Sequence, residues 1–271
     1  MDLLLDKILT NIKQVFIDED KYGFDKHIWE YKPNGSFIGD SVVFNMAENT
    51  TPPTFYFVIS PYDITSKKAP QHALVFKDGL SVINTDYTEY AAMRTGAMDT
   101  LVLQALGISS LNEKKILMFG RGKTATWSVK FLKHTFADCP EITVVHSETP
   151  RDSYDISDFD IIICHTNAKE FVLSAEDRKN IKKGAIITNF ISTESNTEVD
   201  PSFFDHEKAN VVIDWKPNLK RAPEIPNSKE IIQLKELLNE TKKLEINKKY
   251  SVFRFLGTPL QNLAVLKTLT S

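Results

Sequence analysis

Residues 114–147 read KKILMFGRGKTATWSVKFLKHTFADCPEITVVHS, and this segment decides the fold. Its first apolar run, Ile116–Phe119, predicts a short buried strand, and Ile142–Val145 predicts a second one. Between them, residues 120–125 read GRGKTA, which matches the pattern G-x-G-x-x-G/A. A helical pattern follows, with one apolar face made of Ala125, Val129, Leu132 and Phe136. Because the glycines stand between a strand and a helix, the segment is typical of a dinucleotide-binding turn.

Each small residue of this turn has a role in that interpretation. Gly120 permits the tight turn, Gly122 lets the backbone approach a pyrophosphate, and Ala125 allows the helix to pack closely on the strand. The free N–H groups at the start of the helix would attract the phosphates. An ordinary strand-to-helix turn without a ligand is the alternative. We predict that the cofactor binds at Gly120, Arg121, Gly122, Lys123, Thr124 and Ala125.

The composition argues against several classes of protein. The chain has 271 residues, enough for one large domain or two modest ones, and its net charge of −3 argues against nucleic acid as the main partner. Its two cysteines are far apart and predict no disulfide framework, and its six histidines show no metal-ligand spacing. The sequence shows neither a long apolar stretch nor a signal peptide. We therefore expect a cytoplasmic protein that has no metal and does not bind a membrane.

The first third of the chain has a different sequence pattern. Residues 1–20 carry apolar residues at helical spacing, which predicts a leading helix. Residues 41–45, 55–59, 73–76 and 80–83 read as short strands separated by turn residues, and Lys77-Asp78-Gly79 predicts a hairpin turn. This part of the chain is therefore expected to form a mainly antiparallel sheet.

The remainder alternates between strands and helices. Helices are predicted at residues 88–106, 174–181, 228–241 and from 258 onward, and strands at 159–164, 185–189, 211–214 and 250–256. This alternation predicts a parallel sheet covered on both faces, in which ligands lie at the carboxyl ends of strands. His165, Thr166 and Asn189 stand at such ends. His165 is a candidate general acid or base, with a locally hydrogen-bonded histidine as the alternative.

The end of the second strand bears on which dinucleotide binds. Proteins that bind NAD place an acidic residue there, about 20 residues past the glycines, to bond the ribose 2′-hydroxyl. Here that place holds His146 or Ser147. Without a carboxylate nothing repels a 2′-phosphate, and Ser147 with Arg151 would hold one. The sequence predicts NAD(P)(H) as the cofactor and favours NADP(H).

Five segments together resemble the ornithine cyclodeaminase/mu-crystallin family. They are the element MRTGA at residues 93–97, the glycine turn with its flanking strand and helix, the two strands at 160–166 and 184–189, and VFRFLGTPLQNL at 252–263. The likeness runs from about residue 86 to the C-terminus, whereas the first 85 residues match loosely.

The resemblance implies a Rossmann domain at residues 98–244 and a substrate-binding domain built from residues 1–97 and 245–271. The final strand and helix would thus join the N-terminal third, in a domain that usually forms a homodimer. In the family the arginine of the RTGA element binds the substrate carboxylate, and Arg94 occupies that place. A guanidinium fork matches a carboxylate through two hydrogen bonds. A structural salt bridge of Arg94 is the alternative.

The chain departs from the family at several functional positions. The place of the family's catalytic aspartate falls on Ser192 or Thr193, and Glu194 is the nearest acid. The family's substrate-binding lysine would fall near Phe55 or Tyr56, and its acidic pair near the C-terminus is Gln261-Asn262 here. These departures argue against the deamination and cyclisation of ornithine.

Three functions remain. The first is an NAD(P)-dependent oxidoreductase that acts on a small imine or amino acid with a carboxylate, using Arg94, Glu194 and His165 as catalytic candidates. The second is a cyclodeaminase-type lyase. The third is a non-catalytic protein of the mu-crystallin type that binds NAD(P)H and a small ligand.

Overall fold

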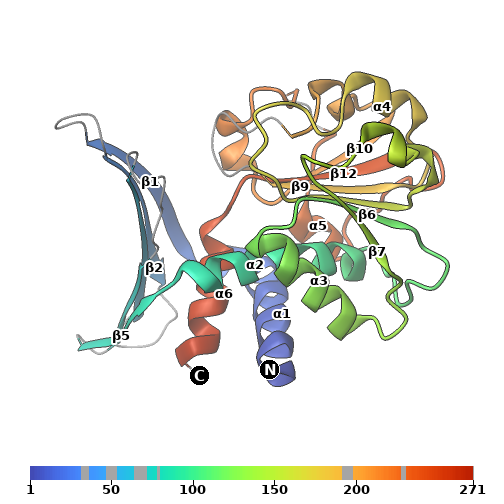
Figure 1. Ribbon diagram of the computed structural model, residues 1–271. Coiled ribbons are helices and arrows are strands. Elements are labelled where there is room, and N and C mark those ends of the chain that lie inside the picture. Colours follow the sequence, from blue (N-terminus) through green and yellow to red (C-terminus); the bar gives the residue numbers. More distant parts are fainter. Residues whose placement is uncertain are drawn as a thin grey trace. The chain divides into compact units, whose positions relative to one another are not determined.

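The computed structural model describes residues 1–31, 37–46, 54–63, 72–77, 80–190, 198–226 and 230–270. The chain divides into two compact units, of which the first is Met1–Thr95 with Thr258–Ser271 and the second is Gly96–Gly257. Helix α2 (Thr88–Ala105) begins in the first unit and continues into the second (Figure 1). No helix in the described part of the chain has the length and apolar character needed to cross a membrane.

The second unit contains a seven-stranded sheet with the order β11-β10-β12-β9-β8-β6-β7. Every pair of neighbouring strands is parallel, which confirms the predicted α/β fold with a Rossmann-type sheet. The strands are β6 (Ile116–Phe119), β7 (Ile142–Val145), β8 (Ile161–Cys164), β9 (Ile186–Phe190), β10 (Ala209–Ile213), β11 (Ile232–Gln233) and β12 (Tyr250–Phe255).

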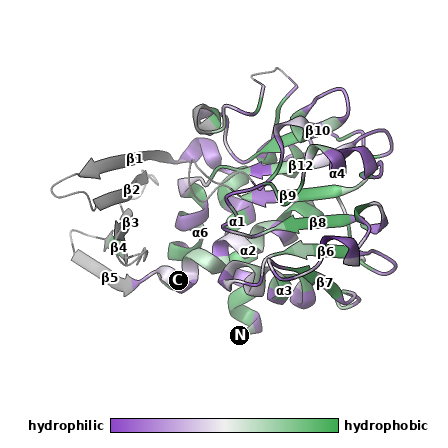
Figure 2. Ribbon diagram, turned by 45° about the horizontal axis from the view of Figure 1, so that its top comes forward, coloured by the Kyte–Doolittle hydropathy of each residue, from purple (hydrophilic) through white to green (hydrophobic). Residues whose placement is uncertain are grey.

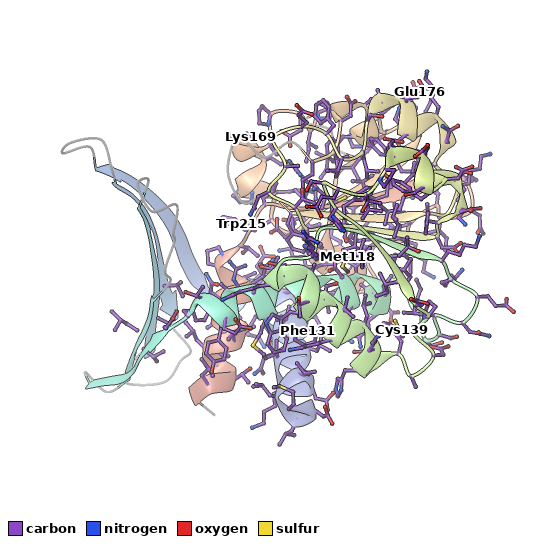
Figure 3. The ribbon with its side chains drawn as sticks, viewed as in Figure 1. Met118, Phe131, Cys139, Lys169, Glu176 and Trp215 are labelled. Atoms are coloured by element: carbon purple, nitrogen blue, oxygen red, sulfur yellow. The ribbon has the colours of Figure 1, made fainter. Side chains whose placement is uncertain are left out.

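Helices cover both faces of this sheet. Helix α3 (Lys123–Thr135) and the second half of α2 lie on one face, and α4 (Ala175–Asn180) lies on the other (Figure 1). Phe131 of α3 and Met118 of β6 are both buried, and Figure 3 shows them in the helical layer and in the sheet. Strands covered on both faces need continuous apolar runs, and β6 and β8 are accordingly buried along their whole length and hydrophobic in Figure 2.

Short segments complete the second unit. Helix α5 (Leu234–Leu238) follows the edge strand β11, and four 3₁₀ helices connect the larger elements. These lie at Arg151–Ser153, Ile156–Asp158, Pro201–Phe204 and Lys216–Arg221.

The first unit contains a five-stranded sheet in which every neighbouring pair is antiparallel, in the order β1-β2-β3-β4-β5. Helix α1 (Asp2–Ile17), which the apolar spacing predicted, packs against α6 (Pro259–Thr270), and Asn11 donates a hydrogen bond of 2.8 Å to Thr268 between them. A 3₁₀ helix, Glu19–Lys21, follows α1. The strands are β1 (Gly23–Tyr31), β2 (Phe37–Met46), β3 (Thr54–Asp63), β4 (His72–Lys77) and β5 (Leu80–Asp86).

The prediction that the final strand joins the N-terminal third was wrong. Strand β12 lies inside the parallel sheet, between β9 and β10, and all six of its residues are buried. A strand with two neighbours and two covered faces hides far more apolar surface there than at the edge of another sheet. Of the final strand and helix, only helix α6 belongs to the first unit.

The predicted helix over residues 228–241 was also wrong in its extent. Ile232 and Gln233 form strand β11, which pairs with β10, and the helix covers only Leu234–Leu238. The apolar residues of this segment suit helical spacing, but backbone hydrogen bonds to the exposed edge of β10 favour an extended start.

Candidate functional site

The glycine turn lies at the carboxyl end of β6, tied to the strands on both sides. The Gly120 N–H donates to the carbonyl oxygen of Val145 over 2.8 Å, and the His165 N–H donates to that of Phe119 over 2.8 Å. Helix α3 then begins with Gly122 as its N-cap, and no side chain caps it. The start of a helix favours a bound anion through its backbone amides and its dipole.

The two glycines of the turn differ in whether the fold itself requires them. Gly120 has φ +107°, and a Cβ built on it would lie 2.2 Å from the carbonyl oxygen of His165. A side chain is therefore excluded there by the protein itself. Gly122 has an ordinary φ of −75°, and a Cβ on it would meet no atom of the described residues within 4 Å. None of the described residues requires a glycine at this position, and its lack of a side chain leaves space among them in front of the helix.

Charged residues gather at the end of β7, beside the turn. The Glu148 carboxylate lies 3.7 Å from the guanidinium of Arg121 and 3.8 Å from Nδ1 of His146. His146 is half-buried, whereas Arg121, Ser147 and Glu148 are exposed. The prediction for this strand end named His146 and Ser147 but missed Glu148, which lies past the expected place in sequence yet folds back toward the turn.

Arg151, which the sequence offered as a second phosphate ligand with Ser147, has partners of its own. Its guanidinium forms an ion pair with Asp177 at the start of α4 and lies 4.6 Å from the ring centre of Tyr154.

Thr166 and Asn189, at the ends of β8 and β9, meet on one buried carboxylate. The Thr166 N–H and hydroxyl both donate to Oε1 of Glu198, the hydroxyl over 2.7 Å, and the Asn189 side chain donates to Oε2 over 2.5 Å. Burial raises the pKa of Glu198, although the two donors from Thr166 oppose the rise. The sequence reasoning missed Glu198, because it lies in no recognisable motif.

Arg254 lies in the same row of the sheet as Asn189. Its side chain is 3% exposed and pairs with Glu224 over 2.9 Å, while its Nε and Nη1 have no hydrogen-bond partner among the described residues. Burial lowers the pKa of Arg254, and Glu224 opposes that shift. Arg254 and Glu198 thus bring a guanidinium and a carboxyl group to the buried carboxyl end of the sheet.

His165 has a different set of partners. Its side chain is 1% exposed, its Nε2 lies 2.7 Å from Oδ2 of Asp99, and its ring lies 5.0 Å from that of Phe190. Asp99, on α2, is buried and also accepts hydrogen bonds from Ser128 and Thr188, both of 2.6 Å. The sequence held a signal for Asp99, which is the one charged residue in the buried run 96–103.

Arg94 lies in the first unit, half-buried on α2. Its Nη1 donates to the side-chain oxygen of Gln261, on α6, over 2.5 Å. An amide oxygen carries no net charge, so this contact does not neutralise the guanidinium. Tyr87 is fully buried nearby and donates to the carbonyl oxygen of Asn262 over 3.4 Å; burial raises its pKa, and Arg94 lowers it in part.

Some predicted residues lie outside the described part of the chain. Glu194, Ser192 and Thr193 are among them, as are Asp78 and Gly79 of the predicted hairpin turn. Among the residues that the structure describes, no cluster of His, Cys, Asp and Glu has the form of a metal site.

The fold consists of two units, and the second contains a Rossmann-type parallel sheet with a glycine turn between β6 and α3. No protein-family model matches the sequence, and no curated protein matches it. Solved structures do match along nearly the whole chain. An ornithine cyclodeaminase from Bordetella pertussis Tohama I, described as probable, superposes with a TM-score of 0.79 at 14% identity, over 99% of this chain and 94% of that one.

Two further structures share the fold. An archaeal alanine dehydrogenase dimer with bound NAD superposes with a TM-score of 0.74 at 16% identity, over 98% of this chain and 90% of the other. A Δ1-pyrroline-2-carboxylate reductase from Thermococcus litoralis, in complex with NADH and L-proline, superposes with a TM-score of 0.75 at 18% identity. The superposition covers 97% of this chain and 91% of that one. The chain therefore has the fold of the ornithine cyclodeaminase/mu-crystallin family.

Proposed function

We propose that the protein is an NAD(P)-dependent oxidoreductase acting on a small imine or amino acid that carries a carboxylate. The observation that carries the proposal is Gly122, which no described residue requires and which leaves space among them in front of the start of α3, where no side chain caps the helix. The solved structures with NAD and with NADH and L-proline support the same class of cofactor and substrate.

The chain's residues divide the work as follows. The turn from Gly120 to Ala125 holds the pyrophosphate through backbone amides. Arg94 binds the substrate carboxylate through its guanidinium fork. The dinucleotide, when bound, supplies or accepts the hydride. The proton that completes imine reduction needs an acid, and Glu194 is the candidate, because the His165 side chain is buried against Asp99.

The preference between NAD(H) and NADP(H) rests on the end of β7. The prediction of NADP(H) relied on the lack of a carboxylate there. Glu148 supplies one beside Arg121 and His146, and a carboxylate bonds a ribose 2′-hydroxyl but repels a 2′-phosphate. We therefore propose NAD(H) as the preferred cofactor. Glu148→Gln should bring NADPH affinity closer to NADH affinity, and unchanged relative affinities would show that Glu148 does not set the preference. A wild type that binds NADPH more tightly than NADH would return the preference to NADP(H).

The proposal is tested by adding small 2-keto acids with ammonia or amines to the protein and following the absorbance of NADH. Oxidation of NADH that depends on protein and substrate supports an enzyme. Tight binding of NADH without turnover over a broad set of such substrates would favour the non-catalytic alternative. If neither NADH nor NADPH binds at millimolar concentration, the dinucleotide site itself is refuted.

A homodimer is proposed as well, because the archaeal neighbour is described as a dimer. The mass of the purified protein in solution, measured by light scattering, decides this.

A further inference from the structure

Asp99 joins four elements of the second unit at one buried point. Its Oδ2 meets Ser128 of α3 at 2.6 Å and His165 after β8 at 2.7 Å, and its Oδ1 meets Thr188 of β9 at 2.6 Å. An ionised carboxylate has only acceptors, so the two hydroxyls and Nε2 of His165 must all donate. A buried carboxylate satisfied in this way fixes the orientation of each donor.

Two of these donors, His165 and Ser128, connect Asp99 to the dinucleotide turn. The backbone of His165 packs on Gly120 so closely that a Cβ there would lie 2.2 Å from its carbonyl oxygen. The position of the His165 peptide therefore sets the position of Gly120. Ser128 lies one turn of α3 beyond Thr124, which is part of the predicted phosphate-binding segment.

The packing of α2 on α3 reinforces this link. A Cβ on Gly96 would lie 2.5 Å from the backbone nitrogen of Ser128 and 2.9 Å from the carbonyl oxygen of Thr124. Helix α2 thus touches the backbone of α3 at its first turns, and Asp99, three residues after Gly96, bonds the same helix through Ser128. Contact and hydrogen bond hold the N-terminal turns of α3 in place.

We infer that Asp99 is a positioning residue for the dinucleotide turn, acting through His165 on Gly120 and through Ser128 on the start of α3. The inference rests on the proposed function for its effect on cofactor affinity, but the effect on the turn itself is independent of that function. It assigns a role to His165 that differs from acid or base catalysis: the imidazole fixes the backbone that closes the turn.

The test compares Asp99→Asn with Asp160→Asn in the full-length protein. Both substitutions change a hydrogen-bonded carboxylate into an amide, but Asp160 precedes β8, whereas Asp99 bonds His165, which follows that strand. An amide at residue 99 has one acceptor oxygen instead of two, so at least one of the three donors loses its acceptor, and the negative charge beside His165 is removed. Asp99→Asn should weaken NADH binding by about tenfold or more, whereas Asp160→Asn should change it less than about twofold. Ser128→Ala, which removes one bond to Asp99, should have a smaller effect in the same direction and serves as the second variant if Asp99→Asn does not fold.

Hydrogen exchange of the protein without cofactor provides the second readout. Amides in residues 119–124 should exchange faster in Asp99→Asn or Ser128→Ala than in the wild type, with β10 and β12 unchanged. NMR of the imidazole nitrogens should place the hydrogen of His165 on Nε2 in the wild type. Faster exchange in a protein that binds no dinucleotide would refute the proposed function and keep the inference. Exchange at the turn that is unchanged in both variants, or that rises equally throughout the second unit, would overturn the inference.

Discussion

The two glycines of the turn predict opposite outcomes for single substitutions. Gly122→Asp should leave the free protein as stable as the wild type or slightly more stable, because Asp is a good N-cap and its charge suits the start of a helix. The same charge should repel a pyrophosphate and abolish dinucleotide binding. Thermal unfolding with and without NADH measures both effects.

Gly120→Ala provides the matched control. It should lower the free energy of unfolding by about 2 kcal/mol or more, because φ +107° and the nearby His165 carbonyl oxygen both disfavour a side chain. A loss of stability in Gly122→Asp as large as that in Gly120→Ala would mean that Gly122 serves the fold rather than a ligand.

Substitutions of Arg94 separate the effect of its positive charge from that of the paired hydrogen bonds of its guanidinium fork. Arg94→Met should abolish turnover, and Arg94→Lys, which keeps the charge without the fork, should raise KM for a carboxylate substrate about tenfold to a hundredfold. NADH affinity should stay nearly constant in both. Gln261→Glu should also raise KM, because a carboxylate 2.5 Å from Arg94 would compete with the substrate. If all three variants instead lower the melting temperature and weaken NADH in parallel, Arg94 is structural.

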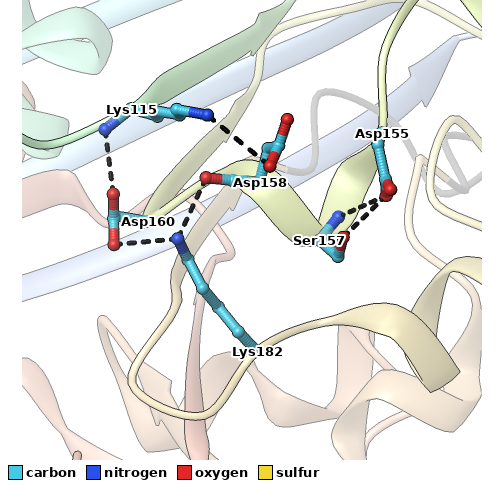
Figure 4. Close-up of polar contacts among 6 residues, drawn as sticks. All are labelled: Lys115, Asp155, Ser157, Asp158, Asp160 and Lys182. Carbon is cyan, nitrogen blue, oxygen red and sulfur yellow. Dashed lines mark hydrogen bonds and ion pairs between the residues drawn. The ribbon is translucent and has the colours of Figure 1, made fainter.

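Contacts at the amino ends of the strands stabilise the fold at a distance from the candidate site. Asp160, before β8, accepts a hydrogen bond of 2.9 Å from the N–H of Lys115 and pairs with Lys182 over 3.0 Å (Figure 4). Lys182 also donates to the carbonyl oxygen of Asp158 over 3.0 Å. Burial alone would raise the pKa of Asp160, but the Lys115 N–H and Lys182 together lower it below its ordinary value.

Because the pKa of Asp160 is lowered in the folded protein, the stability that this carboxylate contributes depends on pH. A carboxylate with a lowered folded pKa adds stability above its unfolded pKa of about 3.9 and loses it as the pH falls through the folded pKa. Asp160→Asn should therefore cost about 1 kcal/mol at pH 7, since the pair is partly exposed, and the difference from wild type should shrink below about pH 4. Urea unfolding of the wild type and the variant at pH 7 and pH 3 measures this difference in the free energy of unfolding. A difference that persists unchanged at pH 3 would assign the effect to shape rather than charge.

At the scale of elements, patterns predicted the type of most segments but not their neighbours. The run at 250–255 reads as a strand in any context, yet it joins the parallel sheet because both of its faces are covered there. Residues 232–238 suit helical spacing, but the first two pair with β10 instead. Strand pairing joins segments that are far apart in sequence, and a local pattern does not encode it.

At the scale of the whole molecule, the departures from the family predict which reaction is absent. By the resemblance, the place of the family's catalytic aspartate would fall on Ser192 or Thr193, and that of its lysine on Phe55 or Tyr56. The protein should release neither ammonia nor proline from ornithine and NAD, because no carboxylate or amine stands at these places. Ammonia release at about 1 s⁻¹ or more would instead support the cyclodeaminase-type lyase.

The sequence by itself determined the Rossmann unit, because a buried strand, a glycine turn and an amphipathic helix are local features with their own composition. It also located the turn residues from Gly120 to Ala125. Only the tertiary structure brought Asp99 to His165, Glu198 to Thr166 and Glu148 to Arg121. These acids lie 66, 32 and 27 positions from their partners. The parallel sheet gathers the carboxyl ends of its strands at one edge, and the packing of α2 brings Asp99 to the residue that follows β8. A hydrogen bond or ion pair acts over about 3 to 4 Å in space and leaves no trace in the spacing of the chain.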